Sequence, residues 1–210
     1  MNDLPKKPEL IFIADSHRYF LDGVEVPSVT QVLEPLVDYS HVPPAVMEHA
    51  RQIGTAVHRA CELYDQHDLV MESLDPRLVG YVNAWDRFLV ECGFVNELIE
   101  PLVWSQVYGC AGRADRVGLA RGVRGQPRVL LEIKTTADFM PSFGPQTAAY
   151  KHLLGETGLV TPAQAARLRR GVVQLREDGS YRLEFYDDPQ DLSVFVACLT
   201  LNHWRKRYAK

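Results

Sequence analysis

Apolar residues in the first half of the chain recur at the three- and four-residue spacing of amphipathic helices. A long helix is predicted over 45–67, after the Pro43–Pro44 pair, and a second over 76–92, where Gly93 follows as a C-terminal cap. Ser28 is a candidate N-cap for a short helix that ends near Leu36. The first half is therefore expected to be mainly helical.

Shorter apolar segments with β-type alternation and turn residues between them mark the strands. They are predicted over 10–14, 18–21, 99–108, 112–119, 128–135, 171–176 and 181–186. Two further helices are predicted over 145–154 and 188–208, and the glycine- and proline-containing stretch 120–127 should close a hairpin. We expect an α/β fold with a central mixed sheet flanked by helices.

No repeat, low-complexity tract or linker interrupts this pattern, so residues 1–210 are expected to form a single domain. Its N-terminal hairpin and helices would cover 1–53, its central part 54–150, and its last strands and helix 170–210.

The composition indicates an ordinary globular protein, with 46% hydrophobic and 24% charged residues. No apolar run approaches the ~18 residues that span a bilayer, and the opening MNDLPKKPEL lacks the apolar stretch of a signal peptide. A cytoplasmic protein without a membrane partner is expected. The net charge of −4 argues against a general polyanion binder, although local basic patches matter more than the total.

The four cysteines, Cys61, Cys92, Cys110 and Cys198, are far apart in the sequence and include no CxxC pair. Free buried thiols are the expected state.

The segment VLLEIKTT contains a charged pair on a predicted apolar strand. Side chains two residues apart share one face of a strand, so Glu132 and Lys134 should project together while Ile133 faces the core. An acidic-x-Lys triplet also arises by chance in most chains of this length. An exposed salt bridge on an edge strand therefore remains an alternative.

The preceding strand contains Gly112 and Asp115, and the predicted hairpin would place Asp115 across from Glu132. Two crowded carboxylates repel each other, and a divalent cation such as Mg²⁺ relieves this repulsion. The alternative is that Asp115 pairs with Arg113 or Arg116.

Two helical pairs add to this pattern. His58 and Glu62 share a face of the long helix, and Gly54, one turn earlier, would let a phosphate or a backbone approach closely. Gln146 and Tyr150 share a face of the helix after the Glu132 strand. A lone helical histidine is more often structural than a ligand, so neither pair is decisive by itself.

Taken together, Gly54xxxHis58, Gly112xxAsp115, Glu132xLys134 and Gln146xxxTyr150 resemble the four motifs of the RecB-like branch of the PD-(D/E)XK nuclease superfamily. The opening HRYFLDGVEVPSVTQVL is similar to the start of small phage and prophage members. The resemblance implies a restriction-endonuclease-like core in a phage- or prophage-encoded protein. Members with an iron–sulfur cluster carry three clustered cysteines after the core, whereas only Cys198 follows it here, so no cluster is expected.

The resemblance also implies roles. Asp115, Glu132 and the Ile133 carbonyl would hold one or two Mg²⁺ or Mn²⁺ ions, with His58 as a further ligand that Glu62 positions. Lys134 would orient the attacking hydroxide or stabilise the transition state. Glu100 is a further candidate for a second cation or a water, and Gln146 and Tyr150 would line the groove.

DNA contacts are expected from dispersed basic residues. They are Arg51, Arg59, Arg167, Arg169, Arg170 and the tail HWRKRYAK. A charge run of this kind is more often an ordinary solvated face, which is the alternative for the tail.

The expected activity is hydrolysis of DNA phosphodiester bonds by an exonuclease that acts on DNA ends in recombination, replication or repair. An endonuclease or nicking enzyme is the alternative within the same superfamily, and a catalytically silent nucleic-acid-binding or regulatory protein is the alternative of another class. Linear DNA ends, a recombination or single-strand-annealing protein and a second copy of the chain are the partners considered.

Overall fold

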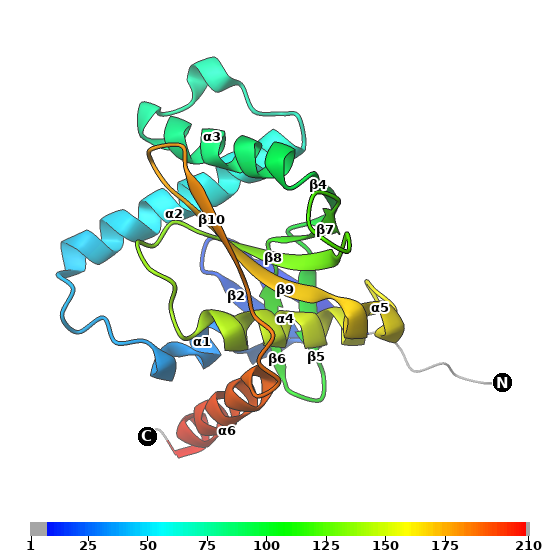
Figure 1. The fold of residues 1–210 in the computed structure, drawn as a ribbon. Helices are drawn as coiled ribbons and strands as arrows, with labels where there is room; N and C mark the ends of the chain where they lie inside the picture. Colours follow the sequence, from blue (N-terminus) through cyan, green and yellow to red (C-terminus); the bar gives the residue numbers. More distant parts are fainter. Residues whose placement is uncertain (1–7, 209–210) are drawn as a thin grey trace.

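The computed structural model describes residues 8–208, and its centre is a mixed five-stranded sheet (Figure 1). The strand order is β10-β9-β8-β7-β4, in which β8 and β9 run parallel and the other neighbours run antiparallel. The five strands are β4 (Phe94–Ile99), β7 (Arg116–Ala120), β8 (Arg128–Lys134), β9 (Arg169–Leu175) and β10 (Tyr181–Phe185). The predicted α/β class with a central mixed sheet is confirmed.

Helices cover both faces of this sheet, which explains why β8 is apolar on both sides. Val129, Leu131 and Ile133 pack towards α2 and α3, whereas Leu130 packs with the other helices. On the first face lie α2 (Pro44–Asp65) and α3 (Pro76–Glu91), and on the second lie α1 (Val29–Val32), α4 (Phe143–Thr157) and α6 (Asp191–Tyr208). After Arg128 at its start, the central strand is apolar until Glu132 and Lys134 near its C-terminal end.

Two smaller sheets pack beside this core. A three-stranded antiparallel sheet, β1-β2-β3, faces the hairpin β5–β6, and Tyr19 and Ala111 are buried between them. The strands are β1 (Leu10–Ile13), β2 (Arg18–Leu21), β3 (Val24–Val26), β5 (Leu102–Ser105) and β6 (Cys110–Arg113). The predicted N-terminal hairpin is confirmed, and β3 extends it by a third strand.

Local capping signals account for the helix boundaries. The Ser28 hydroxyl accepts a hydrogen bond from the Gln31 N–H, and the Gln31 side chain accepts one from the Ser28 N–H. Gly93, after α3, has φ +52°, the left-handed conformation expected after a helix C-terminus. Three short helices complete the fold: η1 (Glu34–Leu36), η2 (Met71–Ser73) and α5 (Pro162–Arg167). The last was not predicted, although Thr161 and Gln164 form a capping box at its start.

Two predicted strands are wrong in their extent. The segment 99–108 is divided between β4 and β5, and the segment 112–119 is divided between β6 and β7, which belong to different sheets. The chain turns at Glu100, whose φ is +50°, and the next residue is Pro101. Two backbone hydrogen bonds hold this corner, from Glu100 N to Asp115 O at 2.9 Å and from Ala114 N to Pro101 O at 3.1 Å. Glu100 and Asp115 are therefore neighbours at a double corner.

Gly80 is where α3 touches the turn between β9 and β10. A Cβ atom at Gly80 would lie 1.6 Å from the Glu177 carbonyl oxygen. Gly80→Ala should therefore destabilise the protein by about 1–3 kcal/mol through overpacking, although the same change on an open helix face is stabilising. Urea unfolding measures the difference. Asn83→Ala, on the exposed face of α3, is the control, and an equal or higher stability of Gly80→Ala would contradict the close approach.

Within residues 8–208, no helix is both long and apolar enough to cross a bilayer.

Candidate active site

A cavity of about 640 Å³ opens beside the C-terminal end of β8. Its walls come from α2, the start of α4, the double corner and the β1–β2 turn. The predicted site residues among its lining are Gly54, His58, Glu62, Glu100, Asp115, Glu132, Ile133, Lys134, Gln146 and Tyr150, together with Arg59. Residues from five separate parts of the sequence therefore meet in one cavity.

Asp115 and Glu132 face each other because of the β7–β8 register. Arg116 pairs with Leu131, which places the preceding residue, Asp115, opposite Glu132. The Asp115 N–H donates to Glu132 Oε1 at 3.2 Å, and the Ile133 N–H donates to Asp115 Oδ2 at 2.6 Å. The alternative of an exposed pair on an edge strand is wrong, since Glu132 is 1% exposed on a central strand.

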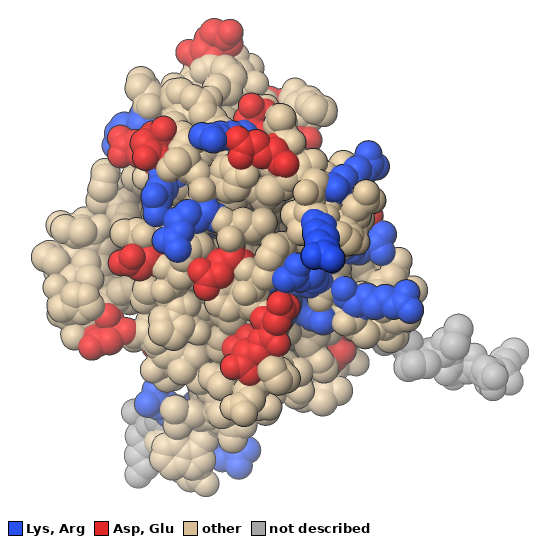
Figure 2. All heavy atoms as spheres, viewed as in Figure 1, with Lys and Arg blue, Asp and Glu red and all other residues tan. Residues whose placement is uncertain are grey.

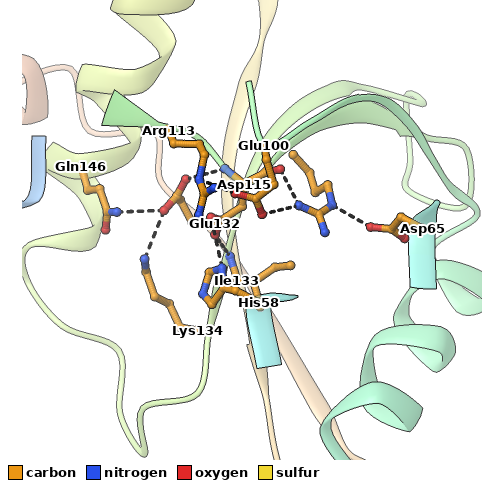
Figure 3. Close-up of polar contacts among 10 residues, drawn as sticks. His58, Asp65, Glu100, Arg113, Asp115, Glu132, Ile133, Lys134 and Gln146 are labelled. Atoms are coloured by element: carbon orange, nitrogen blue, oxygen red, sulfur yellow. Dashed lines mark hydrogen bonds and ion pairs between the residues drawn. The ribbon is translucent and has the colours of Figure 1, made fainter. Parts of the chain in front are cut away.

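Glu132 is also held by two donors on its other oxygen (Figure 3). Lys134 Nζ lies 3.1 Å from Glu132 Oε2, and Gln146 Nε2 donates to the same atom at 2.8 Å. Lys134 also lies 5.4 Å from the ring centre of Phe143. The helix that follows β8 thus fixes the carboxylate of Glu132, and Lys134 remains in the cavity with a defined position.

His58 reaches the site from α2. Its Nδ1 lies 3.3 Å from Asp115 Oδ1. The expected support from Glu62 is not present, because the Glu62 carboxylate binds Arg59 Nη1 at 2.7 Å. His58 and Arg59 lie four and three residues before Glu62, so both can reach its carboxylate, and the permanently charged guanidinium of Arg59 is the stronger partner. Arg51 is likewise paired on the surface, with Glu48 at 2.7 Å.

Glu100 completes a group of ligand atoms with His58 and Asp115. One ligand atom from each of these residues lies within 4.8 Å of the others. Glu100 is held by Arg113 Nε at 3.0 Å and by Arg116 Nη1 at 2.7 Å. The alternative that one of these arginines pairs with the Asp115 carboxylate is wrong, since both bind Glu100, and Arg116 reaches only the Asp115 backbone oxygen.

The sequence did not indicate the anchor behind this group. Arg116 and Asp65 are fully buried and joined at 2.7 Å, so the chain Asp65–Arg116–Glu100 extends from the end of α2 to the cavity (Figure 3). Asp65 falls on the helix face of His58, because the positions 58, 62 and 65 are separated by four and three residues. That spacing was the one signal available for it.

Burial and mutual repulsion set the protonation of the carboxyl groups. Burial would raise the pKa of Asp115, but the charge and hydrogen bond of His58, with Lys134 and the Ile133 N–H, hold it below its usual range. Burial and the nearby Asp115 charge raise the pKa of Glu132, and they do the same for Glu100. Glu100 and Glu132 therefore hold a proton more readily than ordinary glutamates, whereas Asp115 remains ionised.

This donor set fits a divalent cation. Donor atoms on opposite sides of an Mg²⁺ ion lie about 4.2 Å apart, and the His58, Glu100 and Asp115 atoms already lie within 4.8 Å of one another. A histidine among carboxylates suits Mn²⁺ as well as Mg²⁺. In a strand the N–H and C=O of one residue point to the same edge, so the Ile133 carbonyl also faces Asp115. Glu132 lies outside the three-residue group, with both oxygens engaged as described above.

Gly54 and Tyr150 shape the walls of the cavity. A Cβ atom at Gly54 would meet only Thr135 Oγ1 at 3.5 Å, so this position is open to the cavity without a tight contact. Gly112 instead makes room for Tyr150, because a Cβ atom there would lie 2.7 Å from Tyr150 Cε1. Tyr150 is buried, and burial, followed by the Glu132 charge, raises the pKa of its hydroxyl well above the usual value. It is therefore a neutral hydroxyl group in the wall.

Three of the expected DNA-contacting arginines lie at the wrong end of the sheet. Arg169 lies beside Val129, five residues before Lys134, which is about 16 Å along the strand. Arg170 is buried and donates to Gly144 O at 2.9 Å and to Asp191 Oδ2 at 2.8 Å.

Figure 2 shows Lys and Arg side chains gathered over α5, which contains Arg167, and over the neighbouring ends of strands. Of the tail, residues 203–208 form the last turns of α6, and Ala209 and Lys210 lie outside the described residues.

All four cysteines are free thiols. Cys61 packs with the α2–α3 face of the sheet, whereas Cys110 and Cys198 pack on the opposite side. These three cysteines are therefore part of the hydrophobic core.

Comparisons with known proteins add little to this geometry. No protein-family model matches the sequence, and the comparison with curated proteins likewise gives no match. Among solved structures, the crystal structure of a candidate exonuclease from Eubacterium rectale is similar, with a TM-score of 0.47 and 9% identity. The similar region covers 73% of this chain and only 65% of that protein's length. A likeness at this level carries no weight for function, which must be inferred from the site itself.

Metal affinity should increase with pH. Burial, followed by the Asp115 charge, raises the pKa of Glu100 to about 7 and that of Glu132 to about 8. Raised pKa values mean that protons occupy these groups below neutrality and compete with a cation, so we expect Mn²⁺ affinity to rise about 10-fold or more from pH 6 to pH 8. Calorimetry in buffers of different ionisation enthalpy measures both the affinity and the protons released. A pH-independent affinity without proton release would contradict this account.

Proposed function

We propose that this protein is a metal-dependent nuclease that hydrolyses DNA phosphodiester bonds. The observation that carries the proposal is the meeting of Asp115, Glu132 and Lys134 at the β7–β8 hairpin, with His58 in contact with Asp115. Two buried carboxylates with a lysine and a histidine in one open cavity suit a cation that meets a phosphate group. With the four sequence motifs, this arrangement supports membership in the RecB-like branch of the PD-(D/E)XK superfamily.

The residues divide into a cation-holding set and a substrate-directed set. His58, Asp115, Glu100 and the Ile133 carbonyl would hold Mg²⁺ or Mn²⁺, and Glu132 would join them by exchanging a hydrogen bond for the cation. When bound, such an ion lowers the pKa of a coordinated water and neutralises charge on the phosphate.

Lys134 is placed to donate a hydrogen bond to the attacking oxygen or to a phosphate oxygen. Gln146 acts through Glu132, to which it donates a hydrogen bond, and not on the substrate directly. Arg59, at the cavity wall, is the nearest of the expected basic contacts for the DNA backbone.

The finer proposal is an exonuclease that acts on DNA ends in recombination, replication or repair, in a phage or prophage context suggested by the opening segment. An endonuclease differs only in how the substrate reaches the cavity. A silent binding protein with the same fold is disfavoured, since Asp115, Glu132 and Lys134 are all retained and held by specific contacts.

Digestion of end-labelled linear DNA and of covalently closed circular DNA with Mg²⁺ or Mn²⁺ tests the proposal. We expect degradation of the linear DNA only, its abolition by chelation, and a loss of at least about 100-fold in Lys134→Ala. Cleavage of both substrates would identify an endonuclease. DNA binding without metal-dependent cleavage of either substrate would contradict the nuclease assignment.

A further inference from the structure

One wall of the cavity is aromatic and comes from the turn between β1 and β2. Phe12, His17 and Tyr19 line it. Phe12 stacks on Tyr19, its cross-strand partner, with ring centres 4.7 Å apart, and His17 meets both rings edge-on at 5.4 and 5.5 Å. The three rings are in mutual contact, and we call them the aromatic wall.

Packing of the small sheet explains only part of this wall. Tyr19 is 1% exposed and belongs to the buried cluster of that sheet, whereas Phe12 is half-buried and His17 is exposed. His17 has φ +51°, a left-handed conformation that histidine adopts more readily than most residues with a side chain. Its ring lines the cavity although the residue is exposed, so burial in the small sheet does not account for it.

Arg113 links the aromatic wall to the proposed cation ligands. Its guanidinium lies 5.5 Å from the centre of the Phe12 ring, and its Nε lies 3.0 Å from Glu100 Oε2. Glu100 in turn belongs to the group with His58 and Asp115. One arginine side chain thus spans the gap between the wall and the ligand group, a separation comparable with that between phosphate and base within a nucleotide.

We propose that the base of the nucleotide next to the scissile phosphate packs on Phe12 and His17, face-on to one ring and edge-on to the other, because the two rings are nearly perpendicular. A base inside a duplex has both faces covered, so the base on this surface is either unpaired or belongs to the last pair of a DNA end. The substrate class is therefore a single strand or a DNA end, and not the interior of a duplex. This inference rests on the proposed nuclease function and narrows it.

Kinetics with a short single-stranded oligonucleotide and Mn²⁺ test the wall. Phe12→Leu and His17→Asn should each raise KM about 10-fold with little change in kcat, because base stacking on a protein ring is lost. Asparagine tolerates the left-handed backbone at position 17. Ile11→Ala is the matched control, since Ile11 is 47% exposed and points to the other face of β1; its KM should be unchanged.

An abasic site moved along the strand locates the contact. At one position next to the cleaved bond, the abasic site should raise the KM of the wild type about 10-fold. It should not raise the KM of Phe12→Leu any further, because that variant has already lost the same contact. Equal KM values for Phe12→Leu, His17→Asn and Ile11→Ala in an enzyme that cleaves DNA would overturn the wall and leave the nuclease function standing. Melting temperatures identify a variant that fails to fold. If Phe12→Leu does so, His17→Asn is compared with Ile11→Ala, because His17 is exposed and its substitution should leave the fold intact.

Binding of a single strand with 2-aminopurine at that position gives a readout independent of cleavage. With Ca²⁺ present, stacking should quench its fluorescence in the wild type and in Ile11→Ala, and less in Phe12→Leu and His17→Asn. Binding without quenching, or no binding of the single strand, would overturn the wall. Absence of cleavage in Mg²⁺ and Mn²⁺ despite normal quenching would instead refute the nuclease function.

Discussion

Glu132→Gln should lower the rate of DNA cleavage by about 1000-fold or more while DNA affinity stays the same or increases. The amide keeps the size of the side chain but removes a charge that the cation site needs. Glu132 accepts hydrogen bonds from Lys134 and Gln146 on one oxygen and from the Asp115 N–H on the other. In either orientation, the NH₂ group of the glutamine would therefore face a donor. Cleavage of end-labelled DNA and filter binding measure the two effects.

The stability of this variant separates a cation ligand from a structural ion pair. Relief of the repulsion from Asp115 and the new contact between an NH₂ group and a donor oppose each other, so the metal-free melting temperature should change little, while its rise on adding Mn²⁺ should shrink. Glu97→Gln is the matched control, since Glu97 is partly exposed and pairs with Arg128. A Glu132→Gln protein that cuts DNA at the wild-type rate and keeps the full Mn²⁺-dependent rise would end the assignment of Glu132.

Arg116→Met is expected to destabilise the fold by about 3–5 kcal/mol, the loss typical of removing one partner from a buried ion pair. Arg116 and Asp65 have no exposed side-chain surface, and Glu100 is nearly as buried, so Asp65 would lose its counter-ion and Glu100 would keep only Arg113. Chemical denaturation measures the loss. Arg128→Met, which removes an exposed partner of Glu97, should cost under about 1 kcal/mol. Equal losses in the two variants would show that the buried ion pairs Asp65–Arg116–Glu100 contribute no more to the free energy of unfolding than an exposed pair.

The parts of the fold that depend on local signals could be predicted from the sequence. The helices α2 and α3 follow from apolar spacing and from their proline starts, and the β7–β8 hairpin follows from the glycines and proline of its loop. The double corner could not be predicted in this way. Pro101 could have indicated that a strand ends there, but no local pattern indicates that the chain then leaves one sheet for another.

In the site, too, local patterns predicted some residues, whereas contacts between distant segments determined the others. Same-face spacing predicted that Glu132 and Lys134 project together, and the hairpin predicted Asp115 opposite them. Partner choice was not predictable, because Glu62 is within reach of both His58 and Arg59 on one helix. Glu100 was predicted only as a further candidate for a cation or a water, and Arg116 was not predicted as its partner, because their contacts join segments that are distant in sequence.

The most direct test of the central claim is the position of Mn²⁺ in crystals grown at a saturating Mn²⁺ concentration. Anomalous scattering locates the ion independently of any assumption about its ligands. We expect a peak about 2.0–2.6 Å from an oxygen of Asp115 and a ring nitrogen of His58, with Glu132 or Glu100 as a further ligand. Well-ordered His58, Asp115 and Glu132 side chains without an anomalous peak between them would contradict the account.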